Sequence, residues 1–143
     1  MNAHRFDHWP SLLSAYLESR RTVPFRYGSH DCCLFAADAI LAITGIDPAA
    51  SFRNRYQSAF GATRRMRETC AQATVDRLAA IVFAECGFPA IAPVYASRGD
   101  IVAIRQPLSI VLAVIALDGR PVIAAESGWC ASDRKHAIAA WRI

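Results

Sequence analysis

The chain of 143 residues is 54% hydrophobic and 20% charged, and its formal net charge is +4 at pH 7. This composition excludes a disordered or collagen-like chain and favours one packed domain over residues 1–143. The longest apolar run, residues 110–117, is too short to span a membrane, and residues 1–10 lack the apolar centre of a secretory signal.

The first predicted element is an amphipathic helix near the N-terminus. Its apolar residues recur with the spacing of one helical face: Trp9, Leu12, Leu13, Tyr16 and Leu17. Pro10 suits the first turn of a helix, and the pair at residues 23–24, which ends in proline, stops it.

A second helix is predicted over residues 32–43, where the sequence is apolar on every side except at Asp38. A helix that is apolar all round lies buried among other elements rather than on a surface. Ser29 or Asp31 supplies its N-cap, and Gly45 closes it. We therefore expect this helix to be the centre of the core.

Two further helical stretches are predicted before residue 87. A cap signal at residues 47–48 opens a short helix toward residue 60, which Gly61 ends. Thr63 caps a second stretch, which keeps an apolar helical face as far as residue 86.

The C-terminal part of the sequence is typical of strands. Strands are predicted at residues 101–104, 110–117 and 121–125, with a hairpin turn at residues 118–119 and a last short strand within residues 137–143. Helices followed by antiparallel strands indicate the α+β class. We expect a helical N-terminal half, with its buried central helix packed on a small antiparallel sheet.

Arginine supplies fifteen of the sixteen basic residues, and five arginines form a cluster in the middle of the chain: Arg53, Arg55, Arg64, Arg65 and Arg67. No zinc spacing, aromatic-glycine motif or recognition-helix pattern accompanies this cluster, so we expect no nucleic-acid partner. A solvated face, or a surface that docks on an acidic protein, is the simpler interpretation.

The five cysteines are irregularly spaced and form no CxxC pair: Cys32, Cys33, Cys70, Cys86 and Cys130. This usage is typical of a protein made in a reducing cytoplasm, with most thiols acting as small buried hydrophobic groups. A zinc site of His30, Cys32 and Cys33 would need ligands that converge, which neighbouring residues at a helix start rarely do. We therefore expect neither a metal nor a cofactor.

The pair Asp31-Cys32 at the start of the central helix is the local feature with chemical content. A thiolate is the reactive form of cysteine, and the amide groups and positive dipole end of a helix N-terminus favour it. A packing role for Cys32 and Cys33 in an apolar helix is the alternative that this pattern leaves open.

Residues 27–35 (YGSHDCCLF) resemble the Gly-x-x-Asp-Cys-x-x-Phe/Leu signature of NlpC-type cysteine peptidases, which have a papain-like fold. Residues 98–102 (RGDIV) are similar to the Gly-Asp strand that precedes the histidine-bearing strand of that family. The resemblance implies that Cys32 is the nucleophile, with Asp31 beside it in the site. The whole pattern also resembles a family of small phage tail proteins encoded beside tail-tip genes.

The base of the peptidase family has no counterpart in this sequence. The positions that match the family's histidine are Leu108, Ser109 and Ile110, and those that match its third polar residue fall at residues 122–125. His136 is the only imidazole downstream and is the candidate base, although a surface position beside Lys135 is the simpler interpretation.

Two functions follow from the resemblance. The first is a cysteine peptidase or amidase that cuts peptidoglycan, with reduced activity. The second is a catalytically silent structural component of a phage tail tip. Both imply synthesis in the host cytoplasm, a place in the virion, and other tail-tip or baseplate proteins as partners.

Overall fold

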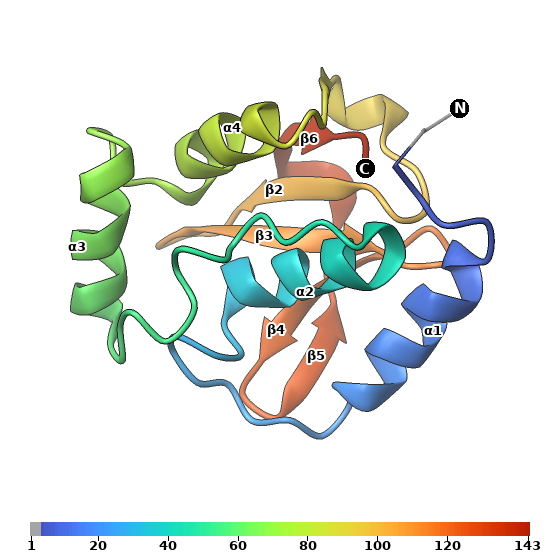
Figure 1. Cartoon of the computed structure of the whole chain (residues 1–143), viewed down its shortest axis with the longest axis horizontal. Coiled ribbons are helices and arrows are strands. Elements are labelled where there is room, and N and C mark those ends of the chain that lie inside the picture. Colours follow the sequence, from blue (N-terminus) through green and yellow to red (C-terminus); the bar gives the residue numbers. More distant parts are fainter. Residues whose placement is uncertain (1–3) are drawn as a thin grey trace.

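The computed structural model of the protein describes residues 4–143, in which helices cover one face of an antiparallel sheet (Figure 1). The helices are α1 (Trp9–Ser19), α2 (Cys32–Thr44), α3 (Ala59–Thr69) and α4 (Val75–Glu85). The strands are β1 (Ala90–Ile91), β2 (Ile101–Arg105), β3 (Ile110–Ile115), β4 (Pro121–Ala125), β5 (Gly128–Ala131) and β6 (Ala137–Trp141). Short 3₁₀ helices lie at η1 (Pro93–Tyr95) and η2 (Arg134–His136). The α+β fold expected from the sequence is confirmed.

The strand order in the sheet is β1-β6-β2-β3-β4-β5, and every neighbouring pair is antiparallel. The pairing of β4 with β3 is short, because only Val122 and Pro121 have partners on β3, at Val114 and Ile115. The first half of β3 therefore has a backbone edge that β4 does not cover within the described chain.

Helix α2 packs against both α1, which lies beside it, and the sheet, as expected for a helix that is apolar on nearly every side (Figure 1). The Asp31 side chain caps its first turn, and Gly45 ends it in the left-handed conformation with φ of 78°. The one acidic residue within α2, Asp38, is satisfied by ion pairs with Arg20 and Arg53. The Asp31 cap and the packing around the helix thus fix the position of the start of α2.

The two faces of the sheet have separate apolar clusters. Residues such as Ala103, Leu112 and Val114 face the helices, whereas Ile104 and Ala113 face the other side, where Ala96 covers them. Alternate residues of a strand point to opposite faces, which explains the division. The position of a strand residue in this alternation therefore decides whether it can approach α2.

The prediction for residues 47–86 was wrong in its element boundaries. Residues 47–57 form turns, because Asp47 caps the amide of Ala49 locally and pairs with Arg53 instead of starting a helix. Helix α3 begins after Ser58, so Gly61 lies inside it, and a second cap position at Thr74 separates α4 from α3. The expected strands were found, while β1 and β5 were not predicted, since each is short.

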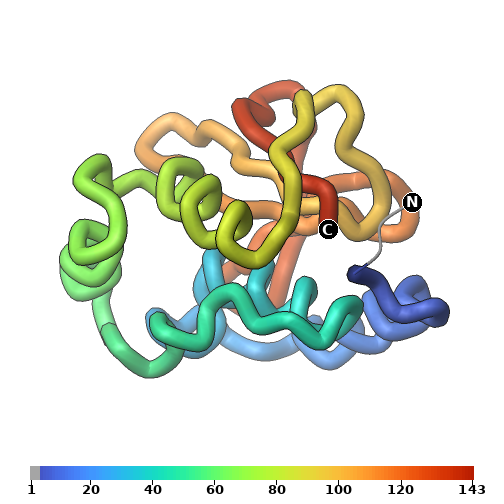
Figure 2. Tube along the Cα trace, turned by 45° about the horizontal axis from the view of Figure 1, so that its top comes forward, coloured from blue at the N-terminus to red at the C-terminus, as the bar shows by residue number. Residues whose placement is uncertain are grey.

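The two ends of the described chain lie side by side, as the blue and red ends of the tube show (Figure 2). The fully buried carboxylate of Asp100 joins them through ion pairs to Arg5 at 2.7 Å and Arg142 at 3.3 Å. It also accepts hydrogen bonds from the backbone amides of Ser97 and Ile143. Asp100 thus ties the N-terminal segment and the last strand to the start of β2.

We predict that Asp100→Ala lowers the free energy of unfolding by about 3–5 kcal/mol, because the arginines and amides around it lose their buried acceptor. Urea denaturation followed by circular dichroism measures this loss. The control is Asp118→Ala in the exposed β3–β4 turn, where the ion pair with Arg120 is open to solvent and a small effect is expected. Equal losses in the two variants would contradict this account of Asp100.

Candidate functional site

The candidate site is built around the carboxylate of Asp31, which is 4% exposed. One of its oxygens accepts the amide hydrogen of Leu34 at 2.9 Å. The other accepts the amide of Gly28 at 3.0 Å and the hydroxyl of Tyr56 at 2.5 Å. Three segments of the chain therefore meet at one side chain, immediately before Cys32.

Glycine is required at position 28 because two backbones approach each other there. Gly28 has φ of 87°, and a Cβ at this position would overlap the carbonyl oxygen of Tyr56. Its carbonyl also accepts the amide of Asn54 at 3.0 Å. This close approach brings Tyr56 to the start of α2.

Cys32 is the first residue of α2, and it is half-buried beside β3. The amide of Ile115 bonds to the carbonyl of Asp100 at the start of β2, so it points to the β2 edge of β3. Backbone amides alternate between the two edges of a strand, and Leu112 is three residues from Ile115. The Leu112 amide therefore points to the opposite edge. That edge is the part left uncovered by β4, and there the Leu112 backbone faces the Cys32 thiol and lowers its pKa. Cys32 thus occupies a gap in the sheet pairing.

The sulfur atoms of Cys32 and Cys33 are 3.9 Å apart. The hydrogen bond from Cys33 lowers the pKa of Cys32 below its ordinary value, and the hydrogen bond from the Leu112 backbone acts in the same direction, against the effect of burial. The same pairing, together with burial, raises the pKa of the Cys33 thiol. Of the two thiols, Cys32 is therefore the one that loses its proton more readily.

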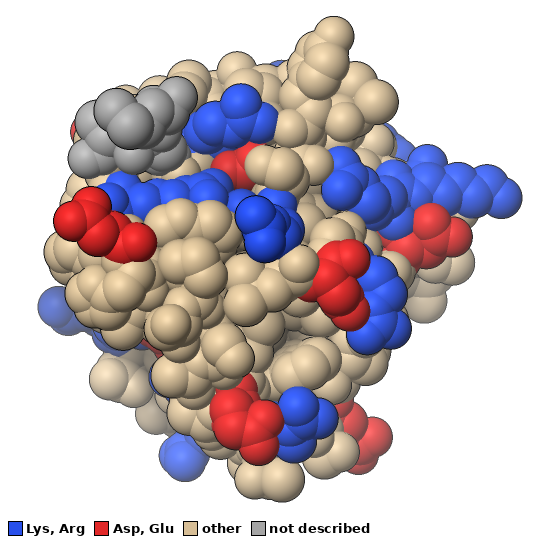
Figure 3. Space-filling view, turned by 90° about the vertical axis from the view of Figure 1, so that its right-hand side faces the viewer, with Lys and Arg blue, Asp and Glu red and all other residues tan. Residues whose placement is uncertain are grey.

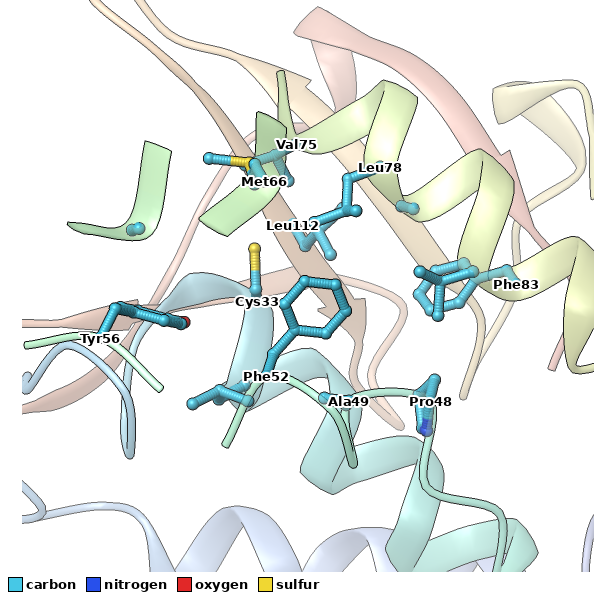
Figure 4. A pocket seen from close by; sticks show the side chains of 15 residues that line it. Cys33, Pro48, Ala49, Phe52, Tyr56, Met66, Val75, Leu78, Phe83 and Leu112 are labelled. Carbon is cyan, nitrogen blue, oxygen red and sulfur yellow. The ribbon is translucent and has the colours of Figure 1, made fainter. Parts of the chain in front are cut away.

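An apolar pocket of about 70 Å³ lies next to this pair (Figure 4). Its wall comes from α2, the turns at residues 47–56, α3, α4 and β3. The Cys33 sulfur points into the space between Met66, Leu112 and Phe52 (Figure 4). The one hydroxyl group in the wall, that of Tyr56, is already bonded to Asp31. The pocket can therefore receive an uncharged apolar group.

The helix-facing residues of β3 and β4 are apolar: Ile110, Leu112, Val114, Val122 and Ala124. The β3 residue in contact with Cys32 is Leu112, further along the strand than the matching positions expected from the sequence, and Leu108 is 99% exposed in the turn before β3. Among residues 4–143, these two strands supply no imidazole or carboxylate that faces the Cys32 sulfur.

The predicted site residues are only partly brought together. Asp31 and Cys32 are adjacent, but the contacts of Asp31 are those of a helix cap. His136 is exposed in η2, whose Arg134 bonds to the carbonyls of Pro93 and Ala96, on the face of the sheet away from α2. No contact within the described chain joins His136 to Cys32, so its role as base stays a prediction without structural support.

His30, two residues before Cys32, is buried elsewhere. Its Nε2 donates to the carbonyl of Gly128 at 3.0 Å, and its ring packs edge-on against Phe35. These contacts make His30 part of the link between the α2 start and β5. They leave the Cys32 thiol without an imidazole partner in the described part of the chain.

Sequence reasoning did not find Tyr56, Leu112 or the role of Cys33. Tyr56 is 25 residues from Asp31, and Leu112 reaches Cys32 only through the register of β3. The adjacent cysteines were visible in the sequence, but adjacency alone does not show that the two sulfur atoms approach each other.

Charges over the surface do not form a strongly basic stripe on the side where α1 lies, since acidic side chains stand beside basic ones there (Figure 3). Within the arginine cluster, Arg53 pairs with Asp38 and Asp47, and Arg65 pairs with Glu68. In residues 4–143, no group of three or more metal-binding side chains converges. Over the same range, no helix is both long enough and apolar enough to cross a membrane.

A central helix that begins at a cysteine and packs on an antiparallel sheet is the arrangement of the papain-like fold. The solved structure of the NlpC/p60 domain of the peptidoglycan hydrolase SagA superposes with a TM-score of 0.56, covering 94% of this chain and 98% of that one. The two sequences are 14% identical, so this likeness concerns the fold.

The sequence itself matches the family described as a domain of unknown function, DUF6950, over residues 4–143. The chain belongs to this family. No curated protein sequence matches it.

We predict that Cys33→Ala slows alkylation of Cys32 by iodoacetamide at neutral pH, by roughly tenfold, because a hydrogen bond to the thiolate is lost. The pKa of Cys32 rises when this donor is removed, so the rate-against-pH curve moves to higher pH. Peptide mass spectrometry measures each cysteine separately, and the exposed Cys130 serves as an internal reference.

Cys33→Ser is the matched variant, since its hydroxyl still donates and keeps most of the reactivity. An unchanged pH profile in Cys33→Ala would show that Cys33 does not act on Cys32.

Proposed function

We propose that the protein is a cysteine hydrolase of reduced activity that acts on the peptide part of peptidoglycan, with Cys32 as its nucleophile. The observation that carries this proposal is the Cys32 thiol at the first turn of α2, with its pKa lowered by two hydrogen-bond donors. The structurally similar SagA domain belongs to a peptidoglycan hydrolase, which supports the same substrate class.

Reduced activity follows from the apolar surroundings of the sulfur. A thiolate can attack a carbonyl without a base, but the leaving amine of a cut peptide bond must receive a proton. Leu112 lies beside Cys32 where such a group would act, and Cys33 is a poor acid because its pKa is raised. Loss of general acid–base help slows such reactions by roughly 10²–10⁴-fold.

A second candidate function is that of a silent structural component of a phage tail tip. The apolar positions around Cys32 favour it, and so do large apolar side chains on the surface, since Phe60, Val94, Tyr95 and Leu108 are each at least 70% exposed. The location in the virion and the tail-tip or baseplate partners depend on sequence resemblance.

We predict slow release of peptide fragments from purified peptidoglycan, and complete loss of this release in Cys32→Ala. The reason is that Cys32 is the first residue of α2 and has a lowered pKa, whereas the pKa of its neighbour Cys33 is raised. Liquid chromatography with mass spectrometry identifies the fragments, and Cys70→Ala, which changes a thiol bonded to the Gln72 carbonyl, is the matched control.

The hydrolase proposal fails if Cys32→Ala releases fragments as fast as the unchanged protein, or if neither releases any. In the second case, assembled and infectious tails carrying Cys32→Ala would favour the structural role.

A further inference from the structure

The apolar pocket and the Cys32 thiol together suggest a second chemistry. We infer that the pocket holds the aliphatic chain of a short acyl thioester, and that Cys32 takes the acyl group from it. This activity goes beyond peptidoglycan hydrolysis and does not depend on it.

The wall of the pocket selects for an uncharged chain. Phe52, Met66, Leu78 and Phe83 contribute apolar surface, and the Tyr56 hydroxyl is held by Asp31. A charged group placed here would lose its hydration without a partner. The volume of about 70 Å³ is roughly half that of a cavity that holds benzene, so a chain of about four carbons fits.

Two residues connect the pocket to the nucleophile. Leu112 lines the pocket, and its backbone faces the Cys32 thiol. Cys33 also lines the pocket, and its sulfur lies 3.9 Å from that of Cys32. Cys32 itself does not line the pocket, but its sulfur is one contact away from the wall, so the carbonyl end of a chain that packs against Cys33 would lie within reach of it.

The groups around Cys32 suit a thioester better than an amide. The titratable groups near the sulfur are Asp31, Cys33 and Tyr56; β3 presents only the Leu112 backbone, and the helix-facing residues of β4 are apolar. Burial and the nearby Asp31 raise the pKa of Tyr56, so its hydroxyl stays protonated and bound to the carboxylate. None of these groups is placed to protonate a leaving amine, whereas a thiolate leaves without a proton.

The step is a thioester exchange. The Cys32 thiolate attacks the carbonyl carbon of the donor, a new C–S bond forms at Cys32, and the C–S bond of the donor breaks. The electron pair leaves with the donor sulfur as a thiolate, which takes a proton from water. No oxidant or reductant is needed.

The test uses the full-length protein and S-butanoyl-N-acetylcysteamine at neutral pH, followed by intact-protein and peptide mass spectrometry. We expect one butanoyl group on Cys32, and none at that site in Cys32→Ala or Cys32→Ser. The acetyl donor should react roughly tenfold more slowly, because two methylene groups fewer are buried. The succinyl donor, equal in chain length but charged, should react at least as slowly.

Filling the pocket tests the binding site separately from the nucleophile. Ala62 on α3 lines the pocket, whereas Ala59 on the same helix is exposed and does not. Ala62→Leu should abolish the preference for butanoyl over acetyl, and Ala59→Leu should keep it.

Acylation of another cysteine in place of Cys32, or rates that do not depend on the chain, would overturn the inference. Its failure is distinguishable from that of the hydrolase proposal. Fragments released from peptidoglycan without acylation refute only the thioester reaction, and acylation without release refutes only the hydrolase.

Discussion

The carboxylate of Asp31 is the constraint on which the site depends. It binds the first turn of α2 through Leu34, the preceding turn through Gly28, and the distant turn through Tyr56. A buried carboxylate is stable only when donors surround it, so these segments must be in place together. The position of the Cys32 sulfur and one wall of the pocket are thus fixed by the same interaction.

The elements that the sequence predicted well are those whose signals are local and agree with their surroundings. Helix α2 combines an apolar run with a cap at Asp31 and a terminating Gly45, and its burial in the core favours the same helix. At Asp47 the local cap signal is real, since the side chain accepts the Ala49 amide. However, the carboxylate also pairs with Arg53, and the chain forms turns there instead of a helix. Arg53 also pairs with Asp38 on α2, so a tertiary contact overrides the local helix preference there.

The site was predictable only where it is contiguous in sequence. Asp31 and Cys32 lie next to each other, and their residue types indicate a capped, activated thiol. The contact with Leu112 depends on the phase of β3, and a shift of one residue would turn Leu112 to the other face of the sheet. The apolar character of β3 could be read from the sequence, but not which of its residues meets Cys32.

Leu112 links the two chemical properties of the site. Its backbone lowers the pKa of the Cys32 thiol, while its side chain supplies no proton and forms part of the apolar wall. At this one position, the backbone activates the nucleophile, the side chain cannot protonate a leaving amine, and the apolar surface favours an apolar substrate. A thiolate can form without an imidazole when other donors are available, but a peptide bond still needs an acid to break. The site is consequently better equipped for the first half of cysteine catalysis, attack on a carbonyl, than for the departure of an amine.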